Sequence, residues 1–395
     1  MAHDPTQVGA GRSTILEPYD AGVEAALAAC ASLSSPPSFC LVFATTGYDQ
    51  VALLAGVRSV IGAASLAGCS GEGVISGNCS DERDRVVTVM AVASTSIRFS
   101  VESRPDYATD AERCARALAR SLRADGADDL AGVILLVDGI TGDCSSFLAV
   151  MQEELPAHTV VVGGCAGDDM SFSRTYQYAG DQVLSGGVSA VALRGGAKLQ
   201  VAVSHGCSPI GLAHTVTAER DGWLLELDGR PAWSVFKEYL EGDAQDLHAE
   251  GIMHLSLGVP LGPRQLGDDA RFIIRMPMQL EPATGALFFP GGGLSAGAQV
   301  RIMRRDQDQI RHSAEDCAAR LAQPNPPVFV LQFDCAGRGR VMFGNCASQE
   351  IVAPLQRLLG QAGAWLGLHT YGEIAAVGEH LHYHNYTVAL CAVYE

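Results

Sequence analysis

The chain has 395 residues, of which 48% are hydrophobic and 18% are charged. This length and composition favour two domains with large hydrophobic cores. The 44 acidic and 27 basic residues give a net charge of −17. A charge of this sign argues against nucleic acid and anionic membrane surfaces as partners.

The N-terminal segment, residues 1–12, lacks the basic region and the continuous apolar core of a signal peptide. We expect a disordered tail there. No apolar stretch reaches about 18 residues without a charge or a glycine, so we expect no membrane span and a cytoplasmic location. In a reducing compartment the 12 cysteines are expected to stay free, and the absence of a Cys-x-x-Cys pair argues against a structural zinc site.

One sequence unit recurs three times along the chain. Each copy has a short apolar run, a polar loop, a helix-compatible stretch, a second apolar run and a glycine loop. The copies extend from Leu41 to Gly73, from Val133 to Asp169 and from Val328 to Ile374. This pattern is typical of β-α-β units, and in open α/β sheets ligands bind at the loops that follow the strands.

The segments between the units support an internal duplication. A pair of predicted strands follows the first unit and another pair follows the second, and Cys69 and Cys165 are expected at equivalent positions. Beyond about residue 215 the pattern changes to short strands separated by glycine and proline turns. We therefore predict an α/β fold of two domains built from β-α-β units with mixed sheets. The N-terminal domain, residues 13–227, is expected to be internally duplicated, and residues 228–395 form the C-terminal domain.

Several short motifs carry a family resemblance. They are Gly163–Asp168, Gly186–Val188, Gly206–Gly211, Leu227–Ala232, Cys335–Arg340, Thr370–Ile374 and His384–Thr387. In order and spacing they resemble the FIST proteins, which are sensory proteins with paired FIST N and FIST C domains. The resemblance covers nearly everything from about residue 38 to the end of the chain.

The resemblance implies a small-ligand sensor in bacterial signal transduction. A chain without an attached output module is similar to the stand-alone NosP-type FIST proteins, which carry haem, sense nitric oxide and regulate a partner histidine kinase. The expected partners are therefore a small ligand and a histidine kinase or another signalling protein, and a homodimer is left open. An amino-acid or metabolite receptor without haem is the alternative.

The loop Thr370–Ile374 is the first candidate binding element. Tyr371 and Glu373 could hold an amine or a carboxylate together with backbone N–H groups. The alternative is a turn in which Glu373 caps a helix or pairs with an arginine. His369, one residue upstream of the loop, is a candidate haem or metal ligand.

Arg338 and Arg340 lie on a glycine loop after the third predicted strand run. Two guanidinium groups could bind a carboxylate or a haem propionate in bidentate fashion. A structural salt bridge at the domain interface is the alternative.

Histidine and cysteine are both standard axial ligands of haem iron. His205 and Cys207 are therefore candidates, with His254 and His214 as weaker ones, and His205 and His369 are the candidate metal ligands. Against this, a lone histidine is more often structural. The alternating histidines His380, His382 and His384 would point the same way in a strand and suggest a second metal site, although a structural role is the alternative.

A cysteine-dependent enzyme is the alternative from another class of protein. Cys69 and Cys165 would be its nucleophiles, but no histidine segment is tied to either by sequence. The segment Gly68–Glu72 resembles a nucleophile elbow, yet glutamate stands where the last glycine is required. We therefore expect a receptor and no catalytic residues.

Overall fold

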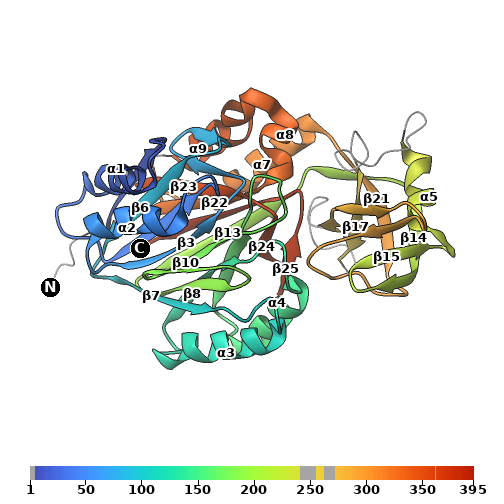
Figure 1. Cartoon of the computed structure of the whole chain (residues 1–395), viewed down its shortest axis with the longest axis horizontal. Helices are drawn as coiled ribbons and strands as arrows, with labels where there is room; N and C mark the ends of the chain where they lie inside the picture. Colours follow the sequence, from blue (N-terminus) through green and yellow to red (C-terminus); the bar gives the residue numbers. More distant parts are fainter. Residues whose placement is uncertain (1–4, 241–254, 262–271, 361) are drawn as a thin grey trace.

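The structure is a computed structural model that describes residues 5–240, 255–261, 272–360 and 362–395. Figure 1 shows a large α/β body and, on its right-hand side, a smaller lobe made mostly of strands. The body contains three copies of one structural unit, and the lobe is inserted into the third copy. The predicted α/β class with mixed sheets is confirmed.

Each unit has the same order of elements: an outer strand, a helix, a strand, a second helical segment, a parallel strand, a hairpin and a closing strand. Unit 1 comprises β1 (Gln7–Ser13), α1 (Pro18–Cys30), β2 (Phe39–Ala44), α2 (Gln50–Ile61), β3 (Ser65–Ser70), β4 (Gly73–Ser76), β5 (Cys79–Asp81) and β6 (Val87–Ala93). Unit 2 comprises β7 (Ile97–Arg104), α3 (Ala111–Ala124), β8 (Leu130–Val137), α4 (Cys144–Glu154), β9 (Val160–Cys165), β10 (Gln177–Ala179), β11 (Gln182–Leu184) and β12 (Val188–Gly195). Unit 3 comprises β13 (Lys198–Ser204), α7 (Gln307–Leu321), β22 (Phe329–Cys335), α8 (Arg340–Phe343), α9 (Ala353–Leu359), β23 (Ala364–Thr370), β24 (Gly372–Val377), β25 (His380–His384) and β26 (Val388–Tyr394).

The three units exchange their hairpins in a ring. The hairpin β10–β11 of unit 2 extends the sheet of unit 1 by pairing with β3. The hairpin β24–β25 of unit 3 extends the sheet of unit 2 through β9, and β4–β5 of unit 1 extends the sheet of unit 3 through β23. Each sheet therefore has six strands drawn from two units, and pulling one unit away would expose unpaired strand edges.

The N-terminal tail is more ordered than expected. Residues 7–13 form strand β1, which pairs antiparallel with β6 along its whole length. The predicted disorder is therefore wrong for this part of the segment. Gly9 and Gly11 let helix α1 lie directly on the strand, because a Cβ atom at either position would come within 2.1 Å of a carbonyl oxygen of that helix.

The lobe occupies the connection between β13 and α7 of unit 3. Its elements are β14 (Cys207–Arg220), β15 (Trp223–Leu227), β16 (Arg230–Pro231), α5 (Ala232–Phe236), β17 (Leu255–Pro260), β18 (Phe272–Arg275), β19 (Gln279–Glu281), β20 (Ala286–Phe288) and β21 (Gln299–Arg305). The strands form one antiparallel sheet in which β21 and β14 pair at the centre. The boundary expected between residues 227 and 228 falls inside this lobe, in the turn between the paired strands β15 and β16. Two of the three body sheets combine strands from both sides of that boundary.

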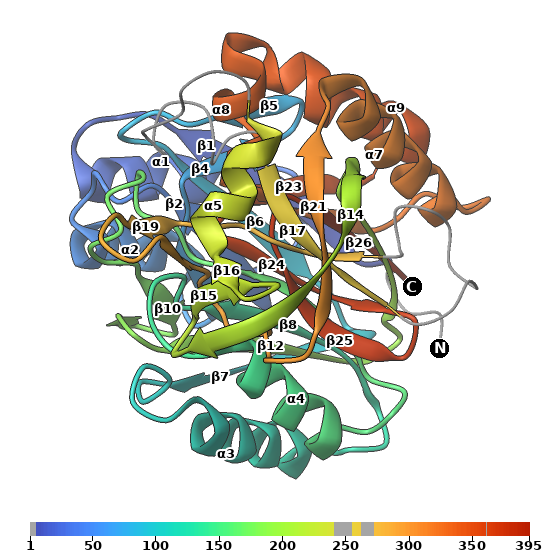
Figure 2. The ribbon, with the colours of Figure 1, turned by 90° about the vertical axis from the view of Figure 1, so that its right-hand side faces the viewer.

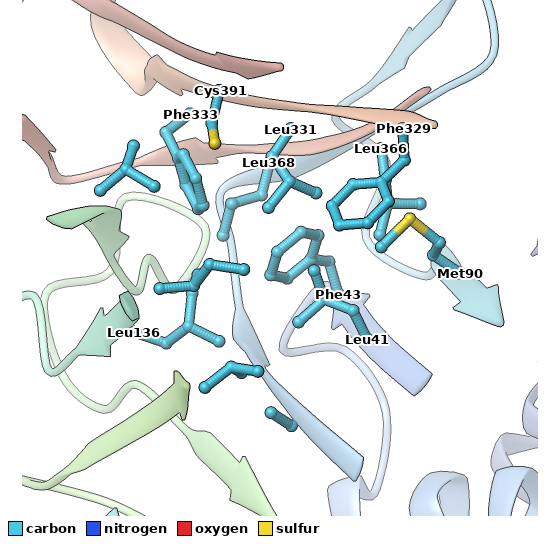
Figure 3. Close-up of a cluster of buried hydrophobic side chains, with 14 of the residues drawn as sticks. Leu41, Phe43, Met90, Leu136, Phe329, Leu331, Phe333, Leu366, Leu368 and Cys391 are labelled. Atoms are coloured by element: carbon cyan, nitrogen blue, oxygen red, sulfur yellow. The ribbon is translucent and has the colours of Figure 1, made fainter. Parts of the chain in front are cut away.

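The inner faces of the three body sheets meet in one apolar core. Figure 3 shows Leu41 and Phe43 of unit 1, Leu136 of unit 2 and Phe329 of unit 3 pointing toward one another. Every residue of β2 is buried, as expected for a strand that is covered on both faces. The helices cover the outer faces. Within the described residues, no helix has both the length and the apolar character that a membrane crossing requires.

Strand register corrects one expected equivalence between the units. Ser70, Cys165 and Thr370 occupy equivalent positions, because each pairs with the last residue of the preceding parallel strand of its unit. Cys69 is thus one residue out of register with Cys165, and the expected equivalence is wrong. Since successive side chains of a strand point to opposite faces, Cys69 lies in the central core and Cys165 lies on the helix-covered face.

Candidate functional site

A cleft of about 540 Å³ lies between the lobe and the N-terminal end of α4. One wall consists of residues between 143 and 149 of unit 2, and the other consists of residues between 219 and 224 and between 289 and 295 of the lobe. Figure 2 turns the lobe toward the viewer, with α4 below it. The volume falls within the range of about 300–1,000 Å³ that is typical of small-ligand pockets. We call this feature the lobe cleft.

A run of three glycines shapes the lobe side of the cleft. Gly291, Gly292 and Gly293 have φ angles of +77°, +70° and +86°, which side chains rarely adopt. A Cβ atom on Gly292 would also come within 2.5 Å of the Asp143 carboxylate. The run is fastened to α4, because the backbone N–H and the hydroxyl of Ser145 both donate to the carbonyl oxygen of Gly291, at 3.1 Å and 2.6 Å.

The lining of the lobe cleft is acidic. Asp143, Glu219 and Asp221 contribute carboxylates, and none of the described residues that line the cleft is basic. Asp143 also caps α4 by accepting hydrogen bonds from the N–H and the hydroxyl of Ser146. Trp223 adds an aromatic side chain. Carboxylates beside an aromatic ring favour a positively charged ligand.

The buried guanidinium group of Arg275 lies next to the cleft wall that α4 provides. Arg275 is 4% exposed, donates to the carbonyl oxygen of Tyr383 and lies 3.5 Å from the Ser145 hydroxyl. Burial lowers the pKa of Arg275, while the neighbouring Tyr383, Cys144 and Asp143 act in the opposite direction. Its Nε atom has no hydrogen-bond partner among the described residues. Arg275 therefore brings positive charge close to the first turn of α4.

The loops of the three units meet at a second polar site, which we call the central junction. A ring of backbone hydrogen bonds joins them: Glu72 N donates to His369 O, Gly167 N donates to Ser70 O, and Tyr371 N donates to Cys165 O. The three distances lie between 2.9 and 3.1 Å. Each bond runs from a loop of one unit to a strand end of another, so the ring fixes the three loops relative to one another.

Tyr371, Asp168 and Glu72 meet at the central junction, one from each unit. The Tyr371 hydroxyl donates to Asp168 Oδ1 at 2.7 Å and lies 3.3 Å from Glu72 Oε2. Burial raises the pKa of Glu72 to about 7. Burial also opposes ionisation of Asp168, but donors that include the N–H of Arg174 and the Tyr371 hydroxyl outweigh it and lower the pKa. Phe172 stacks on the Tyr371 ring at 4.8 Å and covers it.

Glu373, predicted to contact a ligand, is instead enclosed by protein. Its carboxylate accepts hydrogen bonds from the hydroxyl of Thr370 at 2.6 Å and from the N–H and hydroxyl of Thr387 at 3.1 Å and 2.6 Å. The side chain has no exposed surface. Burial raises the pKa of Glu373 to about 8. The glutamate therefore ties β23 and β24 to the start of β26.

The predicted residues His369 and Arg340 come together around Glu82. His369 Nε2 lies 2.7 Å from the Ser80 hydroxyl and 3.6 Å from Glu82 Oε1, and Arg340 N donates to the same Glu82 oxygen. His369 has no exposed surface, and its Nδ1 has no hydrogen-bond partner among the described residues. The side chain of Arg340 is exposed.

Arg338 forms a buried ion pair with Asp334 of its own unit, not the salt bridge at the domain interface that was one of its two expected roles. Its Nε donates to Asp334 Oδ1 at 2.7 Å, and neither side chain has any exposed surface. Asp334 Oδ2 accepts from the side-chain amide N–H of Gln332, and the side-chain amide oxygen of Gln332 accepts from the indole N–H of Trp365. These contacts form a buried polar chain beneath the helices of unit 3.

His205 lies in the connection from β13 to the lobe, and Cys207 is the first residue of the lobe strand β14. Both are buried, and the backbone N–H of Cys207 donates to His205 Nδ1 at 2.8 Å. His214 lies elsewhere in the lobe, bonded to Asp228 and Tyr239. His254 falls outside the described residues. No histidine or cysteine is among the described residues that line the lobe cleft or two other surface clefts, so the haem site stays a prediction.

His380, His382 and His384 do lie on one strand, β25, with neighbouring ring centres 6.3 Å and 6.0 Å apart. Burial lowers the pKa of His382 to about 4 and that of His384 to about 3. His384 Nε2 lies 3.1 Å from the carbonyl oxygen of Ala375. In the described part of the chain, no three or more histidine, cysteine, aspartate or glutamate side chains are arranged so that they could hold one metal ion.

The two cysteines of the enzyme alternative lack the features of an activated nucleophile. Cys69 and Cys165 are buried, and their thiol pKa values are raised, for Cys69 by burial and for Cys165 by its contact with Cys144 and by burial. A reactive thiol needs the opposite shift, because the thiolate is the nucleophile.

The cleft residues Asp143, Glu219, Asp221 and Trp223 were not among the predicted site residues. Two features of the sequence near these residues could have drawn attention to them: the run of three glycines at 291–293 and the aspartate that precedes α4. Neither signal shows that the two segments face each other. That relationship depends on the insertion of the lobe into unit 3.

The fold defines an α/β protein in which a lobe is inserted into a threefold repeat. The FIST N domain family matches residues 38–230, and the FIST C domain family matches residues 232–376. The chain therefore belongs to the FIST family. FIST domains are associated with sensing in signal transduction.

Full-length relatives occur in mycobacteria. An uncharacterized protein of Mycobacterium tuberculosis is 30% identical over 397 residues, which cover 97% of this chain and 98% of the relative. An uncharacterized protein of Mycobacterium bovis is 29% identical over 398 residues, with the same coverage. The crystal structure of a chorismatase aligns over the full length of both chains with 10% identity and a TM-score of 0.38, which is too low to support an argument.

Proposed function

We propose that this FIST protein is a small-ligand receptor that binds a compact amine in the lobe cleft. The single observation that carries the proposal is a cleft of about 540 Å³ whose described lining contains three carboxylates, a tryptophan and no basic side chain. A carboxylate binds an ammonium group through charge-assisted hydrogen bonds, and an indole ring attracts the same cation through its face. Amino acids and small polyamines have this chemistry.

The position of the cleft supports a receptor with a moving part. The lobe joins the body through two short connections, between Ser204 and Cys207 and between Arg305 and Gln307. A ligand held between the lobe and α4 binds both sides of this joint, so binding favours one lobe orientation over others. A histidine kinase or another signalling protein would then bind the liganded and free forms with different affinity. Couplings of this kind amount to roughly 1–3 kcal/mol.

Ligand binding is tested by thermal unfolding with a panel of primary amines, amino acids and quaternary ammonium compounds, and with carboxylic acids of similar size as the negative set. A ligand present at about 100 times its dissociation constant stabilises the native state by about 2.7 kcal/mol. We expect stabilisation by members of the amine set alone. Stabilisation by acids alone would overturn the amine assignment.

The location of the site is tested with a Glu219→Gln, Asp221→Asn double variant. Loss of two charged hydrogen-bond acceptors is expected to weaken binding of the amine found in the panel by roughly 10-fold or more. Glu153→Gln is the matched control, because Glu153 is an exposed carboxylate on α4 that does not line the cleft. Equal affinity of the double variant and the control would place the ligand elsewhere.

Haem binding is measured with the same preparations. Protein purified with haem supplied should show a Soret band that changes in His205→Ala or His369→Ala if the haem prediction holds. A protein that binds amines and shows no such band is a FIST receptor without haem.

A further inference from the structure

We propose that the ligand of the lobe cleft is a linear diamine or polyamine that bridges the cleft, with one ammonium group at Asp143 and another at Glu219 and Asp221. This inference rests on the proposed function and narrows it, because an amino acid would bring a carboxylate into the cleft as well as an ammonium group. Two ammonium groups are indicated because carboxylates line both walls of the cleft.

Residues 289–295 of the lobe are bonded to both walls. At the lobe wall, Phe289 N donates to Gly222 O at 2.8 Å. At the body wall, Gly291 O accepts from the N–H of Ser145 at 3.1 Å and from its hydroxyl at 2.6 Å. The carboxylates of the two walls therefore lie on either side of this segment, and a ligand that reaches both must cross it.

The body wall has no side chain that can receive the carboxylate of an amino acid. Its lining residues are Asp143, Ser145, Ser146 and Ala149. Both donors of Ser145 are already bonded to the lobe, and the N–H and hydroxyl of Ser146 donate to the Asp143 carboxylate at 3.0 Å and 2.7 Å. Each carboxylate oxygen of Asp143 can accept a further hydrogen bond. This wall therefore offers an acceptor to an ammonium group.

The lobe wall presents two more carboxylates and an aromatic ring. Glu219 and Asp221 form no ion pair with any described residue. Trp223 lies beside them, with its ring 5.3 Å from that of Phe288. Arg275 is 4% exposed and does not line the cleft, so it does not offer its charge to a ligand there. A molecule with an ammonium group at each end matches both walls.

Three related ligands test the inference by calorimetry on the full chain. Cadaverine has an ammonium group at both ends, pentylamine has one end only, and lysine is cadaverine with an added carboxylate. We expect cadaverine to bind about 10-fold or more tightly than pentylamine, because it makes a second charge-assisted hydrogen bond, and more tightly than lysine by a similar factor. Putrescine, butylamine and ornithine repeat the comparison with a shorter chain.

Asp143→Asn assigns the second ammonium group. Asparagine is also a good N-cap, so the variant keeps the start of α4 and removes the charge. We expect the ratio of cadaverine affinity to pentylamine affinity to fall about 10-fold. Asp49→Asn is the matched control and should keep the wild-type ratio, because Asp49 caps α2 by accepting from Val51 N and Ala52 N and does not line the cleft.

The outcomes separate this inference from the proposed function. If amines bind but each diamine binds no more tightly than its monoamine, or if lysine binds as tightly as cadaverine, the bridging diamine is wrong and the amine receptor stands. If no amine binds, or if the Glu219→Gln, Asp221→Asn double variant and the Glu153→Gln control bind amines equally, the proposed function is wrong and this inference with it.

Discussion

The hydroxyl of Tyr371 donates a 2.7 Å hydrogen bond to Asp168, a residue 203 positions earlier in the chain. The same hydroxyl lies 3.3 Å from Glu72 of unit 1, so one side chain of unit 3 touches the loops of both other units. Together with the ring of backbone hydrogen bonds around it, this contact joins the three units to one another at the central junction.

Removal of the Tyr371 hydroxyl should destabilise the protein. Tyr371→Phe keeps the ring that stacks on Phe172 and removes the donor to the Asp168 carboxylate. Hydrogen bonds to charged groups contribute about 1.5–3 kcal/mol, and we expect a loss of that size in urea-induced unfolding. Tyr176→Phe is the control, because the Tyr176 hydroxyl has no hydrogen bond among the described residues. Equal unfolding free energies for the two variants would show that the hydrogen bond from Tyr371 to Asp168 does not stabilise the protein.

Glu373 should make stability depend on pH. Its pKa is about 8 in the folded protein, against an ordinary value of 4.5, because burial disfavours the charged form. The folded state therefore holds the proton more tightly than the unfolded state, and this contribution to stability is complete below pH 4.5 and is lost as pH rises toward 8. Glu72, with a pKa of about 7, acts in the same direction.

The Glu373→Gln variant tests this dependence. An amide can donate to the Thr370 hydroxyl and accept from the Thr387 N–H, so it imitates the protonated acid at every pH. We expect the unfolding free energy of the variant to fall less steeply than that of the wild type between pH 4.5 and 8. Glu153→Gln, at an exposed position, should leave the profile unchanged. If the unfolding free energies of Glu373→Gln and the wild type depend on pH in the same way, Glu373 is not the source of the pH dependence.

The buried pair of Arg338 and Asp334 should be costly to break. Arg338→Met leaves a carboxylate without its cation in a site with no exposed surface, and such changes cost about 3–5 kcal/mol. Adding Asp334→Asn removes the unpaired charge and should restore part of the loss. Arg340→Met is the control, since this side chain is exposed and should change stability by about 0.5 kcal/mol or less. Additive effects of the two substitutions would show that the pair is not coupled.

Gly292 should matter both for stability and for the lobe cleft. An alanine there is strained at a φ of +70° and brings its Cβ within 2.5 Å of Asp143. Gly297→Ala is the matched control, with a φ of +86° but no atom within 4 Å of the added Cβ. Both variants should lose about 1–2 kcal/mol of stability through backbone strain. Only Gly292→Ala should also weaken binding of the amine identified in the thermal panel, by roughly 10-fold in calorimetry.

The repeat and the type of most of its elements could be predicted from the amino-acid sequence alone. Apolar runs that start near residues 41, 133 and 328 are β2, β8 and β22, because strands buried on both faces need continuous apolar sequence. Family motifs along the chain were sufficient to identify FIST domains. The local sequence did not predict the strand at residues 7–13, because its two glycines weaken strand propensity. This segment is a strand because it pairs with β6 and is covered by α1.

Which residues share a site depends on contacts between segments that are far apart in the sequence. Tyr371 and Glu373 are two positions apart, yet one contacts the loops of the other units and the other is enclosed by two threonines, because their surroundings come from different segments. The lobe cleft joins segments around residues 145, 221 and 292. Nothing in their sequences requires them to meet, since only the exchange of hairpins and the insertion of the lobe into unit 3 bring α4 opposite the glycine run.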